Sequence, residues 1–229
     1  MSEAHADEVE ALKHGSSLGA RITYRAVAWI LRGFSKVFWR LEVRHAERFP
    51  QTGAFVIAPV HRSNIDFFLP ALATRRKVRW MAKDSIFVGG LASAGLWMIG
   101  AFPVNRDGID RTTMRNTLAL LADGQPVVMF PEGRRKEGPT ILDPFDGPAF
   151  VACRQRIPIV PVGIGGSDRA MPIGAKMIRP AKITLVIGEP IFPDVELEGR
   201  VPRSQVNALT DELVARLQDV YDEAQRPAR

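Results

Sequence analysis

The sequence predicts an α/β fold of three layers, with helices on both faces of a largely parallel mixed sheet and an amphipathic helical section at the N-terminus. Two observations lead to this prediction. Short apolar runs bounded by Gly or Pro alternate along the chain with longer stretches of helical periodicity. The chain has 229 residues, of which 46% are hydrophobic, so it is long enough to bury one full core.

Six short strands are expected along the chain. The runs that predict them are apolar and end at turn-forming residues, as Gly53 and Pro59 bound the first. They cover residues 54–59, 79–82, 101–104, 126–130, 158–164 and 181–187.

Helices are expected before and between these strands. They cover residues 17–41, 65–74, 86–98, 111–122, 145–155 and 204–224. Asp110 is a suitable N-cap for the helix at 111–122, and Gly124 follows its end. In the last helix, Val206, Leu209 and Leu213 begin an apolar stripe with helical spacing, which we assign to the core.

The chain divides into three sections by composition. Residues 1–15 are rich in acids and read as a disordered tail, residues 16–44 as a membrane-interfacial helical section, and residues 45–229 as the main domain. Between Ser16 and Arg48, seven Lys or Arg stand against two Glu, together with Trp and Phe. That mixture is typical of helices lying in a membrane interface, while the apolar run at 26–31 is too short to span a bilayer. An amphipathic helix packed on the core is the alternative.

The net charge of the chain indicates which kind of partner it binds. The net charge is +6, and Arg75, Arg76, Lys77 and Arg79 form a second basic cluster. Basic surface attracts phosphates of nucleic acid or anionic lipid, but no nucleic-acid-binding motif is present, so we expect an anionic membrane surface as the partner.

The single cysteine, Cys153, excludes an internal disulfide, and no signal peptide is recognisable. We therefore expect a peripheral protein on the cytoplasmic face of the cell membrane.

Residues 85–105 carry no charge, and their length is that of a transmembrane helix. Several Gly residues and Pro103 interrupt the stretch, so we do not interpret it as a span. This stretch packs either against the core or against a bound acyl chain, and the sequence leaves both possibilities open.

His61 and Asp66 follow directly on the first predicted strand. They therefore lie at its carboxyl end, where open α/β sheets bind their ligands. On one continuous helix, five positions rotate about 140° at roughly 100° per residue, so the pair meets only if the chain turns. Ser63 and Asn64 suit such a turn or a helix N-cap. A carboxylate that orients an imidazole makes it a directed base for a hydroxyl proton, although an isolated pair of this kind is more often a capping or surface feature.

Two further strands end in charged turns, at residues 102–106 and 130–135. Arg106 and Arg135 offer planar groups that suit a phosphate or a carboxylate. Gly133 permits a backbone conformation or a close approach that a side chain would block. Taken singly, each block is more often a turn with a salt bridge at a strand end.

Together, the order and spacing of these blocks resemble the glycerolipid acyltransferase family, which includes the bacterial lysophosphatidic acid acyltransferases. The family's His-x4-Asp motif is matched by His61 and Asp66, and the Arg of its second motif by Arg106. Its Phe-Pro-Glu-Gly-Thr-Arg motif is matched at residues 130–135, except for Arg134 in place of Thr. An apolar, Pro-containing strand follows at 157–162, as in the family. The resemblance covers about residues 45–190.

Two other positions depart from the family pattern. Val60 stands where the family usually has Asn, and Asp146 precedes Gly147 where a Lys is frequent. With Arg134, these departures leave the identity of the acyl acceptor more open than the chemistry.

The resemblance implies transfer of a fatty acyl chain from a thioester to the hydroxyl of a lysophospholipid, with 1-acyl-glycerol-3-phosphate as acceptor and phosphatidic acid as product. It implies that His61 is the general base and that Asp66 holds it. The substrate-binding residues that it implies are Arg106, Glu132, Gly133, Arg135 and Lys83, where Glu132 grips a glycerol hydroxyl or orders the arginines. The donor would be acyl-CoA or an acyl carrier protein as co-substrate, with no metal and no other cofactor.

Three alternatives stay open at this point. The same chemistry could act on glycerol 3-phosphate, another lysophospholipid or a glycolipid, and water in place of the acceptor would give a thioesterase. From a different class, the chain could be a non-catalytic basic module that binds membrane surfaces.

Overall fold

The computed structural model describes residues 18–83, 100–104, 111–195 and 200–226. The tail predicted at residues 1–15, the helix predicted at 86–98 and the side chain of Arg106 lie outside these ranges. The predicted helices and strands inside them are found with ends shifted by a few residues, except that the helix predicted at 65–74 is divided into a 3₁₀ helix at 64–67 and a short α-helix at 69–72.

Seven strands of the described residues form one sheet, in the order β1-β7-β6-β2-β5-β3-β4. They are β1 (Glu42–Arg44), β2 (Val56–Pro59), β3 (Arg79–Lys83), β4 (Ala101–Val104), β5 (Val127–Val128), β6 (Ile159–Gly165) and β7 (Thr184–Ile187). Neighbouring strands are parallel except for β6 and β7. Because β1 is parallel to β7, these two strands run against the others. The predicted largely parallel mixed sheet is confirmed.

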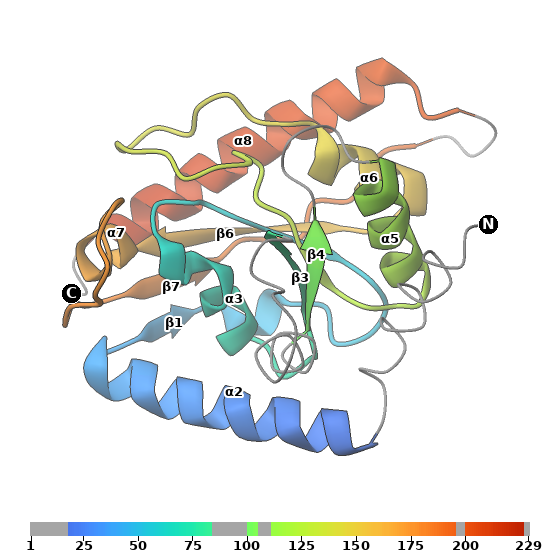
Figure 1. The fold of residues 1–229 in the computed structure, drawn as a ribbon. Helices are drawn as coiled ribbons and strands as arrows, with labels where there is room; N and C mark the ends of the chain where they lie inside the picture. The colour runs from blue at the N-terminus through green and yellow to red at the C-terminus, as the bar shows by residue number, and fades with distance from the viewer. Residues whose placement is uncertain (1–17, 84–99, 105–110, 196–199, 227–229) are drawn as a thin grey trace.

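Helices cover both faces of this sheet. They are α2 (Leu18–Phe38), α3 (Leu69–Leu72), α5 (Arg111–Ala122), α6 (Gly147–Gln155), α7 (Ser167–Ala170) and α8 (Arg203–Gln225), with short 3₁₀ helices η1 (Ala46–Arg48) and η2 (Asn64–Phe67). Figure 1 shows α5, α6 and α8 on one side of the sheet and α2 with α3 on the other. The predicted three-layer architecture is therefore confirmed.

The central strand β2 is buried on both faces, as parallel strands between two helical layers are. Val56 and Ala58 belong to the apolar cluster that includes residues of α5 and α6. Ile57 belongs instead to the cluster that contains Trp39 and Leu69. Alternate side chains of one strand thus join the two helical layers, and the carboxyl end of β2 is fixed from both sides.

The helix α2 ends at Phe38, three residues before the predicted end at residue 41. Arg40 adopts a φ of 46°, and the chain then enters β1, which pairs with β7. The three residues of β1 had been assigned to the N-terminal helical section, because so short a run shows no alternation of its own. Within the part of the chain that the structure describes, no helix has the length and apolar character to span a membrane.

Close backbone contact joins α8 to β6. A Cβ atom added at Gly163 would lie 2.1 Å from the carbonyl oxygen of Val220, and one added at Gly165 would lie 2.1 Å from that of Ala224. Only glycine allows the helix to approach the strand so closely.

Gly163→Ala is expected to lower the free energy of unfolding by about 1–3 kcal/mol, because the methyl group would overlap the backbone of α8. Urea denaturation measures the change. Gly33→Ala is the control, since Gly33 lies within α2 with no atom near its added Cβ, and that variant should be as stable as the wild type or more stable. Equal stability of both variants would mean that α8 is not seated against β6.

Candidate active site

The chain turns directly after β2. Ser63 is the N-cap of η2: its hydroxyl accepts a hydrogen bond from the backbone N–H of Ile65. Asp66 completes a capping box, because its Oδ2 accepts from the backbone N–H groups of Ser63 and Arg62, each at 2.6 Å. The turn that the sequence required between His61 and Asp66 is therefore built by the helix cap itself.

This turn brings His61 and Asp66 together. The imidazole Nδ1 lies 3.3 Å from Asp66 Oδ2. Asp66 is fully buried, whereas His61 keeps 8% of its surface exposed, so the ring edge reaches solvent. A carboxylate that already accepts two backbone hydrogen bonds acts as the acceptor for Nδ1–H. In that tautomer, Nε2 is left as the proton acceptor.

Phe130, the first residue of the block at 130–135, packs against the face of the imidazole. The two ring centroids are 4.1 Å apart, and the planes are tilted by 27°. The ring of His61 is thus held by stacking on its face and by Asp66 at its edge.

A buried ion pair joins Glu132 to Arg62, the residue that follows His61. Glu132 is fully buried, and its Oε2 accepts from Arg62 Nη1 at 2.6 Å and from the backbone N–H of His61 at 3.2 Å. Arg62 also donates to the carbonyl oxygens of Gly138 and Thr140, each at 3.1 Å. The pair therefore links the end of β2 to the loop formed by residues 131–146.

Arg62 was not singled out from the sequence. Its guanidinium lies 5.0 Å above the ring of Tyr221, and only 3% of the residue is exposed. The available signal was its position between His61 and Ser63, at the buried end of a strand, where a charge needs a partner. Nothing in the sequence indicated that this partner would be Glu132 rather than a residue nearby.

Of the remaining predicted site residues, Lys83 ends one strand and Arg135 follows another, and both strands end at the same edge of the sheet. Because β2, β5, β3 and β4 are parallel neighbours, their carboxyl ends meet there. Lys83 is the last residue of β3, and Arg135 is a partly exposed residue of the turn after β5. The backbone N–H of Lys136 donates to the carbonyl oxygen of His61 at 2.9 Å, so this turn is joined to the backbone of His61. Arg106 follows β4 and is not among the described residues.

Gly133 adopts a φ of 64°, and an added Cβ would lie 2.6 Å from the ring of Phe145. Both facts favour glycine at this position. The backbone N–H of Phe145 donates to the carbonyl oxygen of Pro131 at 2.7 Å, which closes the loop on itself.

Comparison with known proteins places this geometry in context. A family model described as Acyltransferase matches residues 40–165, which is more than half of the chain. A 1-acyl-sn-glycerol-3-phosphate acyltransferase of Bacillus subtilis is 26% identical over 191 residues, covering 83% of this chain and 89% of that protein. The human 1-acyl-sn-glycerol-3-phosphate acyltransferase alpha is 26% identical over 201 residues, covering 83% of this chain and 66% of that protein.

A solved structure has the same fold. It is the crystal structure of the 1-acyl-sn-glycerophosphate acyltransferase PlsC from Thermotoga maritima, with a TM-score of 0.69 and 21% identity. The similarity covers 90% of this chain and 83% of that chain.

Glu132→Gln is expected to lower the free energy of unfolding by about 3–5 kcal/mol, because Arg62 would be left buried without a counter-charge. Chemical denaturation measures the loss. Asp143→Asn provides the control, since its ion pair with Lys136 is exposed on the aspartate side and should contribute less than about 1 kcal/mol. A similar small effect for both variants would show that the buried pair does not hold the loop.

Proposed function

The chain belongs to the acyltransferase family, and from that premise we propose that it transfers a fatty acyl chain from a thioester to the free hydroxyl of 1-acyl-glycerol-3-phosphate, which gives phosphatidic acid. One observation carries the proposal: His61 Nδ1 faces the buried Asp66 carboxylate at 3.3 Å, at the carboxyl edge of the sheet. The relatives named for this reaction support the choice of acceptor.

His61 is the general base of this reaction. Its Nε2 accepts the proton of the acceptor hydroxyl while the oxygen forms a bond to the thioester carbonyl carbon. The carbon–sulfur bond then breaks, and the imidazolium returns the proton to the departing thiolate. Asp66 stabilises the imidazolium through Nδ1–H. Assistance of this kind is worth roughly 10²–10⁴-fold in rate.

The transfer proceeds without an acyl-enzyme. Burial raises the pKa of the Cys153 thiol, which lies on α6 in the apolar core and is a poor nucleophile there. The hydroxyl of Ser63 donates to the carbonyl oxygen of Met171 at 2.7 Å and accepts from Ile65, so it is committed to the helix cap. The acceptor oxygen therefore attacks the thioester directly.

The phosphate of the acceptor binds to Arg135, with Arg106 and Lys83 from the neighbouring strand ends. Arg135 supports this role because it is partly exposed and forms no ion pair within the described ranges. Glu132 orders the site through Arg62, as its complete burial favours, and Gly133 shapes the turn.

Asp146, at the position where the family often has Lys, forms an ion pair with Arg203 at the start of α8. A carboxylate thus stands where a cation is frequent, and the same reaction with glycerol 3-phosphate, a different lysophospholipid or a glycolipid is the second candidate. The donor in either case is acyl-CoA or an acyl carrier protein.

The enzyme acts from the cytoplasmic face of the cell membrane, on which α2 lies. Ile22, Trp29, Ile30 and Val37 of this helix are each at least 60% exposed. Tyr24 and Ser35 are buried against the domain, so the helix presents one apolar face outward. Such a helix lies in the headgroup region without crossing the bilayer.

His61→Ala is expected to reduce turnover by roughly 10²–10⁴-fold or more, because the hydroxyl proton loses its acceptor. Product phosphatidic acid and released thiol are measured with 1-acyl-glycerol-3-phosphate and an acyl thioester. His45→Ala is the matched control, since His45 follows β1 and its ring nitrogens lie near Glu47 and Glu223. Turnover close to that of the wild type in the His61 variant would exclude it as the base.

Arg135→Ala is expected to raise the KM for the phosphorylated acceptor with a smaller change in kcat, because it removes a contact to a part of the substrate that does not react. Steady-state kinetics over a range of acceptor concentrations measure both constants. Arg200→Ala replaces an exposed arginine elsewhere and should leave them unchanged. An unaltered KM in the Arg135 variant would place the phosphate on other residues.

A further inference from the structure

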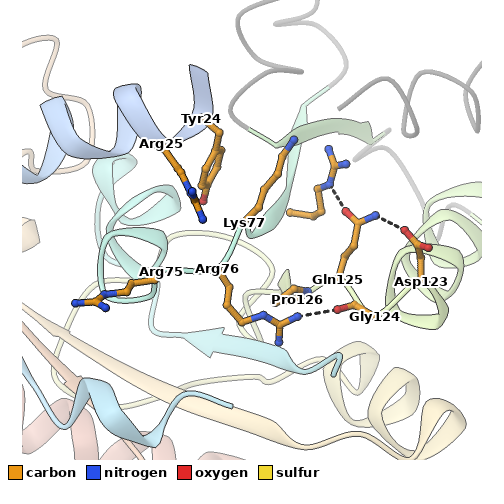
Figure 2. A pocket seen from close by; sticks show the side chains of 10 residues that line it. Tyr24, Arg25, Arg75, Arg76, Lys77, Asp123, Gly124, Gln125 and Pro126 are labelled. Atoms are coloured by element: carbon orange, nitrogen blue, oxygen red, sulfur yellow. Dashed lines mark hydrogen bonds between the residues drawn. The ribbon is translucent and has the colours of Figure 1, made fainter. Parts of the chain in front are cut away.

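A cavity of about 570 Å³, whose lining side chains Figure 2 shows, opens at the edge of the sheet opposite to His61. It lies where β3 and β5 begin, whereas His61 follows the carboxyl end of β2. Its walls come from Tyr24 and Arg25 of α2, from the segment that leads into β3 (residues 75–79) and from the turn before β5 (residues 123–126). The reaction proposed above makes no use of this cavity.

The lining of this cavity is strongly cationic. It includes five basic side chains and one acidic side chain, Asp123, and the five are Arg25, Arg75, Arg76, Lys77 and Arg79. The carboxylate is already engaged, because Asp123 Oδ2 accepts from Gln125 Nε2 at 2.5 Å. A concave surface with this excess of one charge concentrates anions.

Two of the arginines form the fixed wall of the cavity. Arg79 is 1% exposed, and its Nε donates to Gln125 Oε1 at 2.6 Å. Arg76 Nη2 donates to the carbonyl oxygen of Gly124 at 2.9 Å, and its guanidinium lies 5.4 Å from the ring centroid of Phe55. Figure 2 shows the hydrogen bonds from Arg76 to Gly124 and from Gln125 to Asp123 as dashed lines.

The other two arginines stand at the rim. Arg25 and Arg75 are exposed, and neither forms an ion pair or a side-chain hydrogen bond with the residues that the structure describes. Their planar groups are therefore available to an anion, and a phosphate is the anion that such forks bind best.

Lys77 adds a partly buried cation to the lining. Burial and the neighbouring Arg79 lower its pKa to about 8, and its Nζ lies 5.7 Å from the ring centroid of Tyr24. An anion in the cavity would offset the repulsion between these cations and stabilise the protonated lysine.

The position of Arg25 on α2 indicates where the anion comes from. Arg25 is three residues after Ile22 and four before Trp29, so the three side chains lie on one face of the helix. Ile22 is 60% exposed and Trp29 is 73% exposed. A helix that buries those two side chains at the acyl boundary places Arg25 at the level of the lipid phosphates.

We propose that this cavity binds the phosphate of an anionic phospholipid headgroup in the membrane on which α2 lies. Arg25 and Arg75 grip the phosphate from the rim, and the wall of Arg76, Lys77 and Arg79 supplies the attracting charge. The enzyme then contacts the membrane through the apolar face of α2 and through this cavity. The lipid bound in the cavity is a different molecule from the acceptor at His61.

Vesicle sedimentation tests the proposal with phosphatidylcholine vesicles that contain or lack phosphatidylglycerol. The double variant Arg25→Gln/Arg75→Gln should bind the anionic vesicles about 25-fold more weakly than the wild type, at about fivefold for each arginine near the surface. Binding to neutral vesicles and turnover of detergent-dispersed substrate should be unchanged, because neither residue contacts the catalytic site.

The matched control, Arg154→Gln/Arg226→Gln, removes the same charge from exposed positions on α6 and after α8. Its binding to anionic vesicles should change by less than about twofold, because these charges lie away from the cavity and are screened. Equal losses in the two double variants would show that net charge alone drives binding, and would overturn the proposal.

Competition by salt separates a built site from a diffuse positive field. At equal ionic strength, sodium phosphate should release the wild type from anionic vesicles more effectively than sodium chloride, and the Arg25/Arg75 variant should not distinguish the two salts. Equal release of the wild type by both salts would contradict a phosphate site. Specific release by phosphate combined with unchanged vesicle binding of the variant would assign the site to free phosphate and exclude the headgroup.

Discussion

The buried carboxylate of Asp66 is the constraint on which the candidate active site depends. One of its oxygens accepts two backbone hydrogen bonds from the turn after β2 and faces the imidazole of His61. A carboxylate without such partners would be costly to bury, so the helix cap that binds Oδ2 of Asp66 also decides where this oxygen points. The same few residues therefore end a strand, start a helix and orient a base, which leaves little freedom for the position of His61.

The ion pair of Arg62 and Glu132 extends this order to the neighbouring loop. A buried pair of this kind contributes little net stability, because the cost of removing both charges from water offsets their attraction. Its effect here is geometric: the guanidinium and the backbone N–H of His61 share one carboxylate oxygen, and the carbonyls of Gly138 and Thr140 accept from Nε and Nη2 of Arg62. The turn that carries Arg135 is thereby fixed relative to the imidazole.

Much of this arrangement was predictable from local pattern, and the remainder depends on contacts between distant residues. Apolar runs and helical periodicity indicated the layers, and simple helix geometry required the turn that Ser63 makes. The pairing of Arg62 with Glu132 joins residues 70 positions apart, and no local rule selects that partner. The strand β1 exists because β7 offers it an edge, and its three residues carry no strand pattern of their own. The basic cluster at residues 75–79 was visible in the sequence, but no local pattern showed that Arg25 of α2 and the turn before β5 would complete a cavity with it.

The tautomer of His61 tests the central claim most directly. Nitrogen NMR of the histidine-labelled protein, with the signals of His61 assigned by its absence in a His61 variant, reports which ring nitrogen carries the proton in the neutral form. The account predicts a proton on Nδ1, held by Asp66, and an unprotonated Nε2 that is free to accept from the substrate hydroxyl. A neutral ring protonated on Nε2 would contradict it, because Asp66 would then not be setting His61 as the base.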